Sequence, residues 1–170
     1  MKNVVLIGMP GCGKSTIGVL LAKALRYDFV DADLLIQNRY GKLLRELIAE
    51  YGNDGFLKIE NDVNLSIGGE YTVVATGGSA VYCTEAMEQY VAQDIVVYIQ
   101  LSYEEIASRL SNVRQRGVVL KEGQTLRDLY NERTALYEKY AQITVKAEGL
   151  SVEELMDAIA EKVLSYEKTH

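Results

Sequence analysis

The chain has 170 residues and a formal net charge of −6, from 18 Lys and Arg residues against 24 Asp and Glu residues. This length fits one domain, and the negative charge disfavours a whole-surface affinity for nucleic acid or anionic lipid. His170 is the only histidine, and Cys12 and Cys83 are the only cysteines, which excludes a His-based catalytic triad, a four-ligand zinc site and a disulfide framework.

The first expected elements are a strand at residues 4–7, a glycine-rich loop and a helix at residues 15–25. The loop, residues 8–15, reads Gly-Met-Pro-Gly-Cys-Gly-Lys-Ser and matches the phosphate-binding pattern G-x-x-x-x-G-K-[ST] in full. Its backbone N–H groups would surround a phosphate, with Lys14, expected as a surface cation, reaching the β- and γ-phosphates and Ser15 offering its hydroxyl to Mg²⁺. The other expected nucleotide-binding residues are Gly11, Cys12, Gly13 and Thr16. The motif predicts nucleotide binding.

Two aspartates, Asp31 and Asp33, follow a second strand expected at residues 29–31. Ligands of open parallel sheets bind beyond the carboxyl ends of the strands, where the phosphate loop also lies. One aspartate can therefore hold Mg²⁺ through a water, and the other can orient or deprotonate an attacking hydroxyl. The alternative is that Asp33 only caps a helix that begins at Leu34.

Helical periodicity then covers residues 34–36 and 43–48, and Phe56, Ile59 and Val63 form a further helical face. A third strand is expected at residues 72–75. The Gly77-Gly78 pair after it would let backbone N–H groups approach a ligand closely, or would alternatively form a plain tight turn.

A fourth strand, expected at residues 95–99, is a continuous apolar run, and a capping-box pattern at residues 102–105 precedes a helix. Residues 112–124 fit neither periodicity. From residue 112 to residue 127 there are four cations and one anion, a net charge of +3 on an acidic chain. We expect residues 112–124 to form a mobile lid whose arginines close over phosphate; the alternative is a solvated surface loop.

Helices at residues 125–140 and 151–164 and a fifth strand at residues 143–146 complete the chain. Strands that alternate with helices are typical of a parallel sheet with helices on its faces. The chain has no N-K-x-D segment to bind guanine and no room for the extra domains of a helicase. A small phosphoryl-transfer enzyme with a lid remains.

In this order, the motifs resemble those of the shikimate kinase family. The resemblance runs from Asn3 to about Ile159 and includes the phosphate loop and three segments, namely Phe29-Val-Asp-Ala-Asp33, Ala75-Thr-Gly-Gly78 and Arg133-Thr-Ala-Leu-Tyr-Glu138. It implies a three-layer α/β P-loop NTPase fold in one domain, residues 1–170, with a five-stranded parallel sheet in the order 2-3-1-4-5. It also implies aromatic amino acid biosynthesis, in which ATP with Mg²⁺ phosphorylates a hydroxyl of a small cyclic acid.

The resemblance also implies residue roles. Asp33 holds the acceptor hydroxyls and acts as the base, while Asp31 supports Mg²⁺ through water. Arg116 is the lid arginine, and Arg109 packs on adenine, with a solvated helix residue as the alternative. The expected acceptor pocket contains Gly77, Gly78 and the carboxylate-binding Arg133.

The chain departs from the family mainly at the expected acceptor site. The family motif F-R-x-x-E reads Phe56-Leu-Lys-Ile-Glu60, so Leu57 replaces a second carboxylate-binding arginine. The family's triple glycine ends in Ser79, which places a hydroxyl at the pocket wall. We therefore expect shikimate to be a poor substrate, unless Arg45 or Lys58 restores the missing cation. The lid motif R-P-L-L also changes, to Arg-Gly-Val-Val at residues 116–119.

The sequence thus predicts a kinase that transfers phosphate from ATP to a hydroxyl of a small molecule, with shikimate as the family's acceptor. One alternative is the same chemistry on another cyclitol, sugar acid or polyol. The other is a nucleotide-binding regulatory protein, which would not need Asp33, Arg116 or Arg133. We expect a cytoplasmic protein without membrane partners, because the apolar runs fall far below the roughly 20 residues of a membrane span. The net charge of −6 disfavours nucleic-acid partners. We also expect a monomer, because the sequence has no long apolar seam beyond what one core requires.

Overall fold

The structure is a computed structural model that describes residues 2–111 and 120–170. Its middle layer is a five-stranded parallel sheet in the order β2-β3-β1-β4-β5, which confirms the expected topology. The strands are β1 (Val4–Ile7), β2 (Asp28–Asp31), β3 (Thr72–Ala75), β4 (Ile95–Gln100) and β5 (Ile143–Lys146). The helices are α1 (Lys14–Leu25), α2 (Ala32–Tyr40), α3 (Leu44–Leu65), α4 (Thr84–Gln93), α5 (Tyr103–Leu110), α6 (Leu126–Tyr140) and α7 (Val152–Thr169), with a short 3-10 turn, η1 (Ala80–Tyr82).

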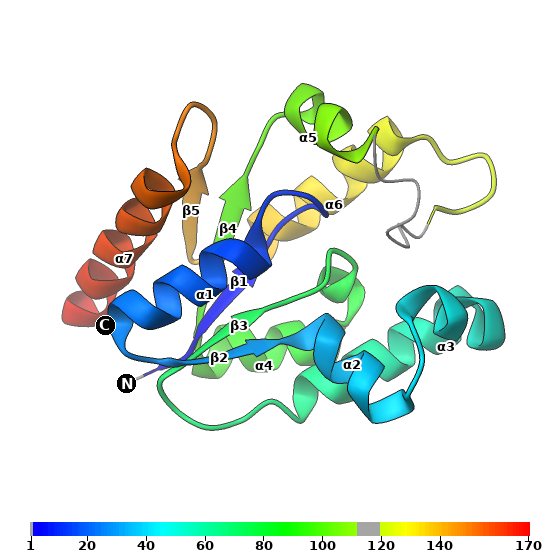
Figure 1. Ribbon diagram of the computed structural model, residues 1–170, viewed down its shortest axis with the longest axis horizontal. Coiled ribbons are helices and arrows are strands. Elements are labelled where there is room, and N and C mark those ends of the chain that lie inside the picture. The colour runs from blue at the N-terminus through cyan, green and yellow to red at the C-terminus, as the bar shows by residue number, and fades with distance from the viewer. Residues whose placement is uncertain (1, 112–119) are drawn as a thin grey trace.

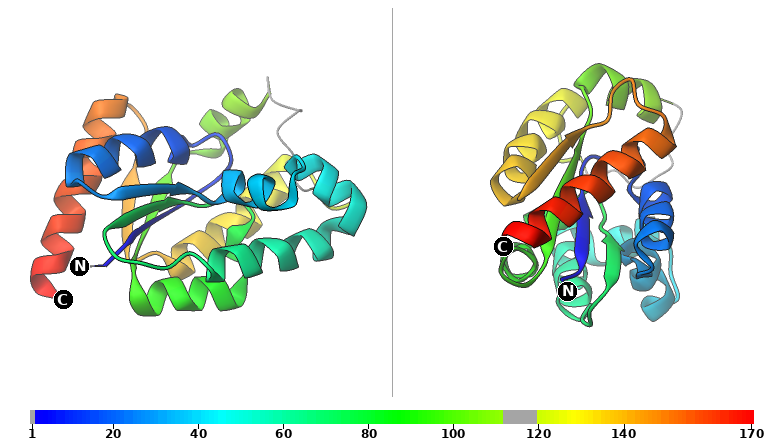
Figure 2. Two further views of the ribbon diagram at one scale, coloured as in Figure 1. Left: turned by 60° about the horizontal axis from the view of Figure 1, so that its bottom comes forward. Right: turned by 90° about the vertical axis from the view of Figure 1, so that its left-hand side faces the viewer.

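The centre of the sheet is apolar on both faces. β1, β3 and β4 are rich in valine and isoleucine, and nearly all of their side chains are buried. β1 pairs with β3 on one side and with β4 on the other, so that Val4 is aligned with Val73 and with Ile95. Helices α1 and α7 cover one face of the sheet and α4 and α6 cover the other (Figure 1 and Figure 2). The strands are apolar runs because both faces lie under helices.

The helices differ from the expected ones in three places. The segments expected at residues 43–48 and around Phe56 both lie in α3, which consists of two helical segments joined at a kink at Gly52. Gly52 has a φ of 73°, a conformation that glycine adopts without the steric cost of a Cβ. Helix α4 was not predicted, although it buries Ala86, Met87 and Tyr90, and α7 runs five residues past the expected end at Leu164.

Side-chain caps define the starts of three helices. The expected capping box at Ser151 is present, and Thr125 forms another at the start of α6. Ser102 accepts a hydrogen bond from the N–H of Glu105, as expected. Its own N–H, however, donates to Glu148, from the turn after β5, so only half of this capping box is local.

The connections after β1, β2 and β3 meet at the carboxyl edge of the sheet (Figure 1). This is the edge at which open parallel sheets bind ligands. Among the described residues, no helix combines the length and the apolar character needed to cross a membrane.

Candidate active site

The phosphate loop joins β1 to α1, and glycine conformations determine its shape. Gly8, Gly11 and Gly13 all have positive φ, and Gly13 is the left-handed residue just before α1 begins at Lys14. A Cβ on Gly8 would lie 2.8 Å from the carbonyl oxygen of Ile99, so the close packing of the loop on β4 requires glycine. The loop therefore ends at a helix N-terminus, where backbone N–H groups favour an anion.

Lys14 is inside the loop rather than on the surface, so our expectation of a surface cation was wrong. Its side chain is 7% exposed, and its Nζ donates to the carbonyl oxygens of Gly8 (2.7 Å) and Met9 (2.9 Å). These bonds bring the ammonium to the centre of the loop. Lys14 lines a cavity of about 410 Å³ together with Gly11, Gly13, Ser15 and Thr16, four of the other expected nucleotide-binding residues. Cys12 is buried in the loop, with its Sγ 3.7 Å from Nζ of Lys14.

Ser15 and Asp31, the two residues expected at a magnesium ion, are in contact. The Ser15 hydroxyl donates to Oδ2 of Asp31 at 2.7 Å. The other oxygen of Asp31 accepts from the N–H of Leu34 at 3.1 Å, so Asp31 is the N-cap of α2. This donor set, a hydroxyl and a carboxylate beside a phosphate loop, fits Mg²⁺, which prefers oxygen ligands and few protein side chains.

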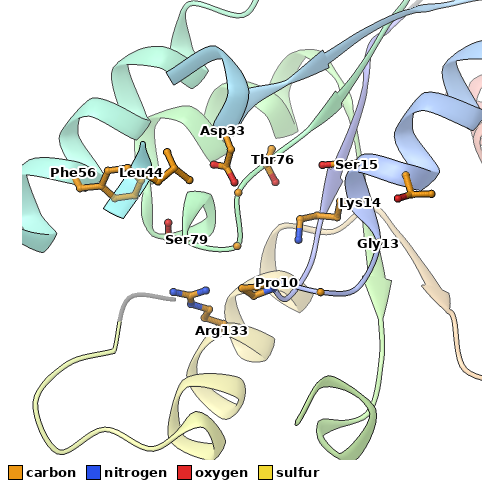
Figure 3. Close-up of a pocket in the computed structure, with 14 residues that line it drawn as sticks. Pro10, Gly13, Lys14, Ser15, Asp33, Leu44, Phe56, Thr76, Ser79 and Arg133 are labelled. Atoms are coloured by element: carbon orange, nitrogen blue, oxygen red, sulfur yellow. The ribbon is translucent and has the colours of Figure 1, made fainter. Parts of the chain in front are cut away.

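Asp33 lies in the first turn of α2 and faces the cavity. Because α2 is capped by Asp31, the alternative that Asp33 is the helix cap was wrong. Figure 3 shows its carboxylate across the cavity from Lys14. Burial and the nearby Asp31 raise the pKa of Asp33 to about 6, although the ammonium of Lys14 acts in the opposite direction. A carboxylate with a pKa near the working pH is suited to accept a proton.

The Gly77-Gly78 pair lines the cavity and packs closely against acidic side chains on one side and the phosphate loop on the other. A Cβ on Gly77 would lie 2.5 Å from Oδ1 of Asp33 and 2.8 Å from Oε2 of Glu60. A Cβ on Gly78 would lie 2.7 Å from Cγ and Cδ of Pro10. The β3 connection therefore packs closely against the acidic side chains and the phosphate loop, and the absence of a Cβ at both positions makes room for this packing.

Glu60, on α3, is a buried carboxyl group beside this turn. Its side chain is 1% exposed, its Oε1 is hydrogen-bonded to the Ser79 hydroxyl at 2.6 Å, and its Oε2 has no hydrogen-bond partner among the described residues. Burial, and then the charge of Asp33, raise the pKa of Glu60 to about 8, against the opposing effects of Ser79, Arg133 and Lys14. This raised pKa favours the neutral form of Glu60, which repels an incoming acid less than an ionised glutamate would.

Arg133 is placed by α6 on the other side of the Gly77-Gly78 turn. It is 2% exposed, and its Nη1 would be 3.0 Å from a Cβ on Gly78. The guanidinium lies over the ring of Tyr82, 5.4 Å from its centroid, and within the part of the chain that the structure describes Nε has no hydrogen-bond partner. The neighbouring Tyr137 donates to the carbonyl oxygen of Gly78 at 2.6 Å and so fixes this side of the turn. Arg133 is a buried cation with unused donor capacity.

Leu57 is half-buried on α3 and does not line the cavity. Its carbonyl oxygen accepts a hydrogen bond from the thiol of Cys83 at 3.5 Å. Arg45 and Lys58, which we considered as substitute cations, are exposed and also lie outside the cavity lining. Of the described residues, the cations that line the cavity are Lys14 and Arg133. Neither proposed substitute therefore replaces the arginine that Leu57 displaces.

Arg109 and the lid complete the expected nucleotide side. Arg109 is exposed, but its Nη1 donates to the carbonyl oxygen of Gly11 at 3.1 Å and its Nε pairs with Glu105 at 3.0 Å. The side chain therefore lies along the phosphate loop instead of extending freely into solvent. Arg116 and most of the expected lid lie outside the described residues.

Four cavity-lining residues were not assigned to the site from the sequence: Pro10, Leu44, Phe56 and Thr76. Pro10 and Thr76 are within motifs that we had identified, so proximity to those motifs could have indicated them. Phe56 also begins the segment compared with the family motif F-R-x-x-E, whereas Leu44 carries only the apolar periodicity of a helix, which does not distinguish a core residue from a pocket residue.

Comparisons with known proteins agree on one family. The shikimate kinase family model matches residues 10–164. The shikimate kinase of Geobacter sulfurreducens is 39% identical over 162 residues, covering 94% of this chain and 89% of the relative. That of Thermodesulfovibrio yellowstonii is 34% identical over 172 residues, covering 99% and 96%.

Solved structures give the same result. Shikimate kinase from Acinetobacter baumannii in complex with shikimate superposes with a TM-score of 0.90 at 30% identity, covering 98% of this chain and 94% of that one. Shikimate kinase from Aquifex aeolicus superposes with a TM-score of 0.84 at 30% identity, covering 98% and 97%.

Proposed function

This chain belongs to the shikimate kinase family and is an ATP-dependent small-molecule kinase, and we propose that it phosphorylates a hydroxyl of a polyhydroxylated ring acceptor, shikimate or a close analogue. One observation carries the proposal. The carboxylate of Asp33 and the ammonium of Lys14 face each other across a single cavity of about 410 Å³. A base for the hydroxyl and a cation for the phosphate thus line the same cavity.

On the donor side, the proposed role of the loop is to hold the ATP phosphates. Its N–H groups and the start of α1 bind the phosphate oxygens, and Lys14 stabilises the charge that develops on the transferred group. Ser15 and Asp31 would hold Mg²⁺, which when bound neutralises phosphate charge. The proposed role of Arg109 is to pack against the base, and that of Arg116 is to close over the phosphates and exclude water.

On the acceptor side, the proposed base is Asp33. As the acceptor oxygen forms its bond to the γ-phosphorus, the bond from that phosphorus to the leaving ADP oxygen breaks, and the hydroxyl proton moves to the Asp33 carboxylate. The backbone of Gly77 and Gly78 would support the ring, and Arg133 would bind a polar group at its far end. Figure 3 shows Arg133 and Ser79 on the side of the cavity away from Ser15.

A second candidate is the same transfer to a different cyclitol, sugar acid or polyol. It is favoured by the cavity lining, in which Arg133 is the only cation, among the described residues, besides Lys14 of the phosphate loop. We propose the cytoplasm as the compartment, because the thiols of Cys12 and Cys83 are unpaired and stay reduced there.

The test is coupled ADP release across a panel of acceptors that includes shikimate, neutral cyclitols, sugar acids and polyols. We expect release to depend on one acceptor class and to be far above hydrolysis without acceptor. ADP release that no acceptor stimulates would contradict the proposal and favour a nucleotide-binding regulatory protein.

A further inference from the structure

Arg133 is a buried cation without an acidic partner of its own. It is 2% exposed, and among the described residues no carboxylate forms an ion pair with its guanidinium. A buried charge is unfavourable unless other groups stabilise it, and a long arginine side chain has many rotamers. Figure 3 nevertheless shows the guanidinium directed from α6 into the cavity. Its placement for an acceptor therefore depends on contacts other than an ion pair.

The ring of Tyr82 supplies one of these contacts. The guanidinium carbon of Arg133 lies over this ring, 5.4 Å from its centroid, within the distance at which the face of an aromatic ring attracts a cation. Nη1 of the same guanidinium lies against Gly78, 3.0 Å from the position that a Cβ would take. Tyr82 and Gly78 both belong to the connection between β3 and α4. This connection thus contacts the guanidinium at two points.

A hydrogen bond fixes the ring of Tyr82 in turn. Its hydroxyl donates to Oε1 of Glu132 at 2.7 Å. The phenol is the donor, because a carboxylate only accepts and because burial raises the pKa of Tyr82 above its ordinary value of 10. Glu132 precedes Arg133 on α6, and its Oε2 accepts from Nε2 of Gln124 at 3.4 Å. The ring is therefore tied to the helix that carries the arginine.

We propose that Tyr82 is a positioning residue, whose ring, held by Glu132, keeps the guanidinium of Arg133 in the orientation that binds the acceptor. Tyr82 does not line the cavity, so it acts through Arg133 and not on the acceptor itself. An arginine that is already ordered loses less side-chain entropy when the acceptor binds, so the acceptor is bound more tightly. This inference rests on the proposed kinase function and adds a residue that determines the affinity of its acceptor site.

The test is steady-state kinetics of Tyr82→Leu with shikimate or, if shikimate is not phosphorylated, with the acceptor of the panel that gives the highest kcat/KM. Leucine removes the aromatic face but keeps an apolar side chain. We expect KM for the acceptor to rise about 3- to 10-fold, the effect of ordering one long side chain on binding, while KM for ATP stays unchanged. A loss of folded enzyme would instead lower the apparent kcat and leave both KM values at their native level.

Two further variants separate the ring from its hydrogen bond. Tyr82→Phe and Glu132→Ala both keep the aromatic face and both lose the bond between these residues. We therefore expect the same rise in acceptor KM from each, about 2- to 3-fold and smaller than that of Tyr82→Leu. Glu132 is exposed, so its variant keeps the fold and decides the result if Tyr82→Leu does not fold.

The matched control is Tyr103→Leu. Tyr103 is also half-buried and also lies beneath an arginine, Arg127, at 4.5 Å, but it does not line the cavity. We expect this variant to keep both native KM values. An acceptor KM that Tyr82→Leu or Glu132→Ala leaves unchanged, or an ATP KM that rises as much as the acceptor KM, would overturn the inference. ADP release by the native enzyme that no acceptor stimulates would instead overturn the proposed function, and this inference with it.

Discussion

Replacing Asp33 with asparagine should lower the turnover of the enzyme without lowering the stability of the fold. Asparagine keeps the size of the side chain but cannot take the hydroxyl proton, so turnover should fall about 10²–10⁴-fold. The pKa of about 6 also predicts that kcat/KM of the native enzyme falls about tenfold per pH unit below pH 6, because the base must be ionised. Steady-state kinetics between pH 5 and pH 8 tests both results.

The same variant should be more stable than the native protein at neutral pH. The pKa of Asp33 rises from 3.8 to about 6 on folding, which makes ionisation unfavourable in the folded state by about 3 kcal/mol. Because the folded pKa is the higher one, this destabilisation is fully present above about pH 6 and absent below about pH 4. Asp33→Asn should therefore raise the free energy of unfolding by up to about 3 kcal/mol at pH 7.5, and by little at pH 4.

Urea denaturation at the two pH values measures this difference. The matched control is Asp31→Asn, at a residue that caps α2 and accepts from Ser15, for which we expect no stabilisation. Near-native turnover of Asp33→Asn would refute its role as the base. A loss of stability at pH 7.5 would refute the electrostatic argument.

Three further changes test the remaining roles. Lys14→Ala should abolish transfer with a native circular dichroism spectrum, because among the described residues its ammonium contacts two carbonyl oxygens and a sulfur of its own loop; an unfolded variant would contradict this. Leu57→Arg should lower KM for shikimate by about 10- to 150-fold, the size of one charge-assisted hydrogen bond, and an unchanged KM would mean that this position does not face the acid. Arg116→Ala should lower kcat more than it weakens ADP binding measured by calorimetry, and equal losses would argue against a role specific to transfer.

The sequence by itself determined the nucleotide side of the molecule. The spacing of glycines, Lys14 and Ser15 defines a phosphate loop within eight consecutive residues. Because the motif is this short, its residue types alone specify the conformation of the loop. The β4 strand could be predicted for a similar reason, since a continuous apolar run is favourable only where helices cover both faces of a sheet.

The structure was needed wherever two local signals competed. Asp31 and Asp33 are both suitable helix caps by residue type, and the N-cap of α2 was decided by where β2 ends. The helical periodicities at residues 43–48 and around Phe56 are separate in the sequence, and the structure joins them across a kink at Gly52. Lys14 is polar enough for the surface, yet its loop folds around it.

Only the tertiary structure decided the acceptor wall. Glu60, Ser79 and Arg133 come from α3, the connection after β3 and α6, and no sequence spacing relates them. Their properties depend on one another, because Ser79 and Glu60 share a hydrogen bond and the pKa of Glu60 depends on Asp33. A local motif specifies its own conformation, whereas the polarity of this wall arises from burial and from contacts that exist only after the chain has folded.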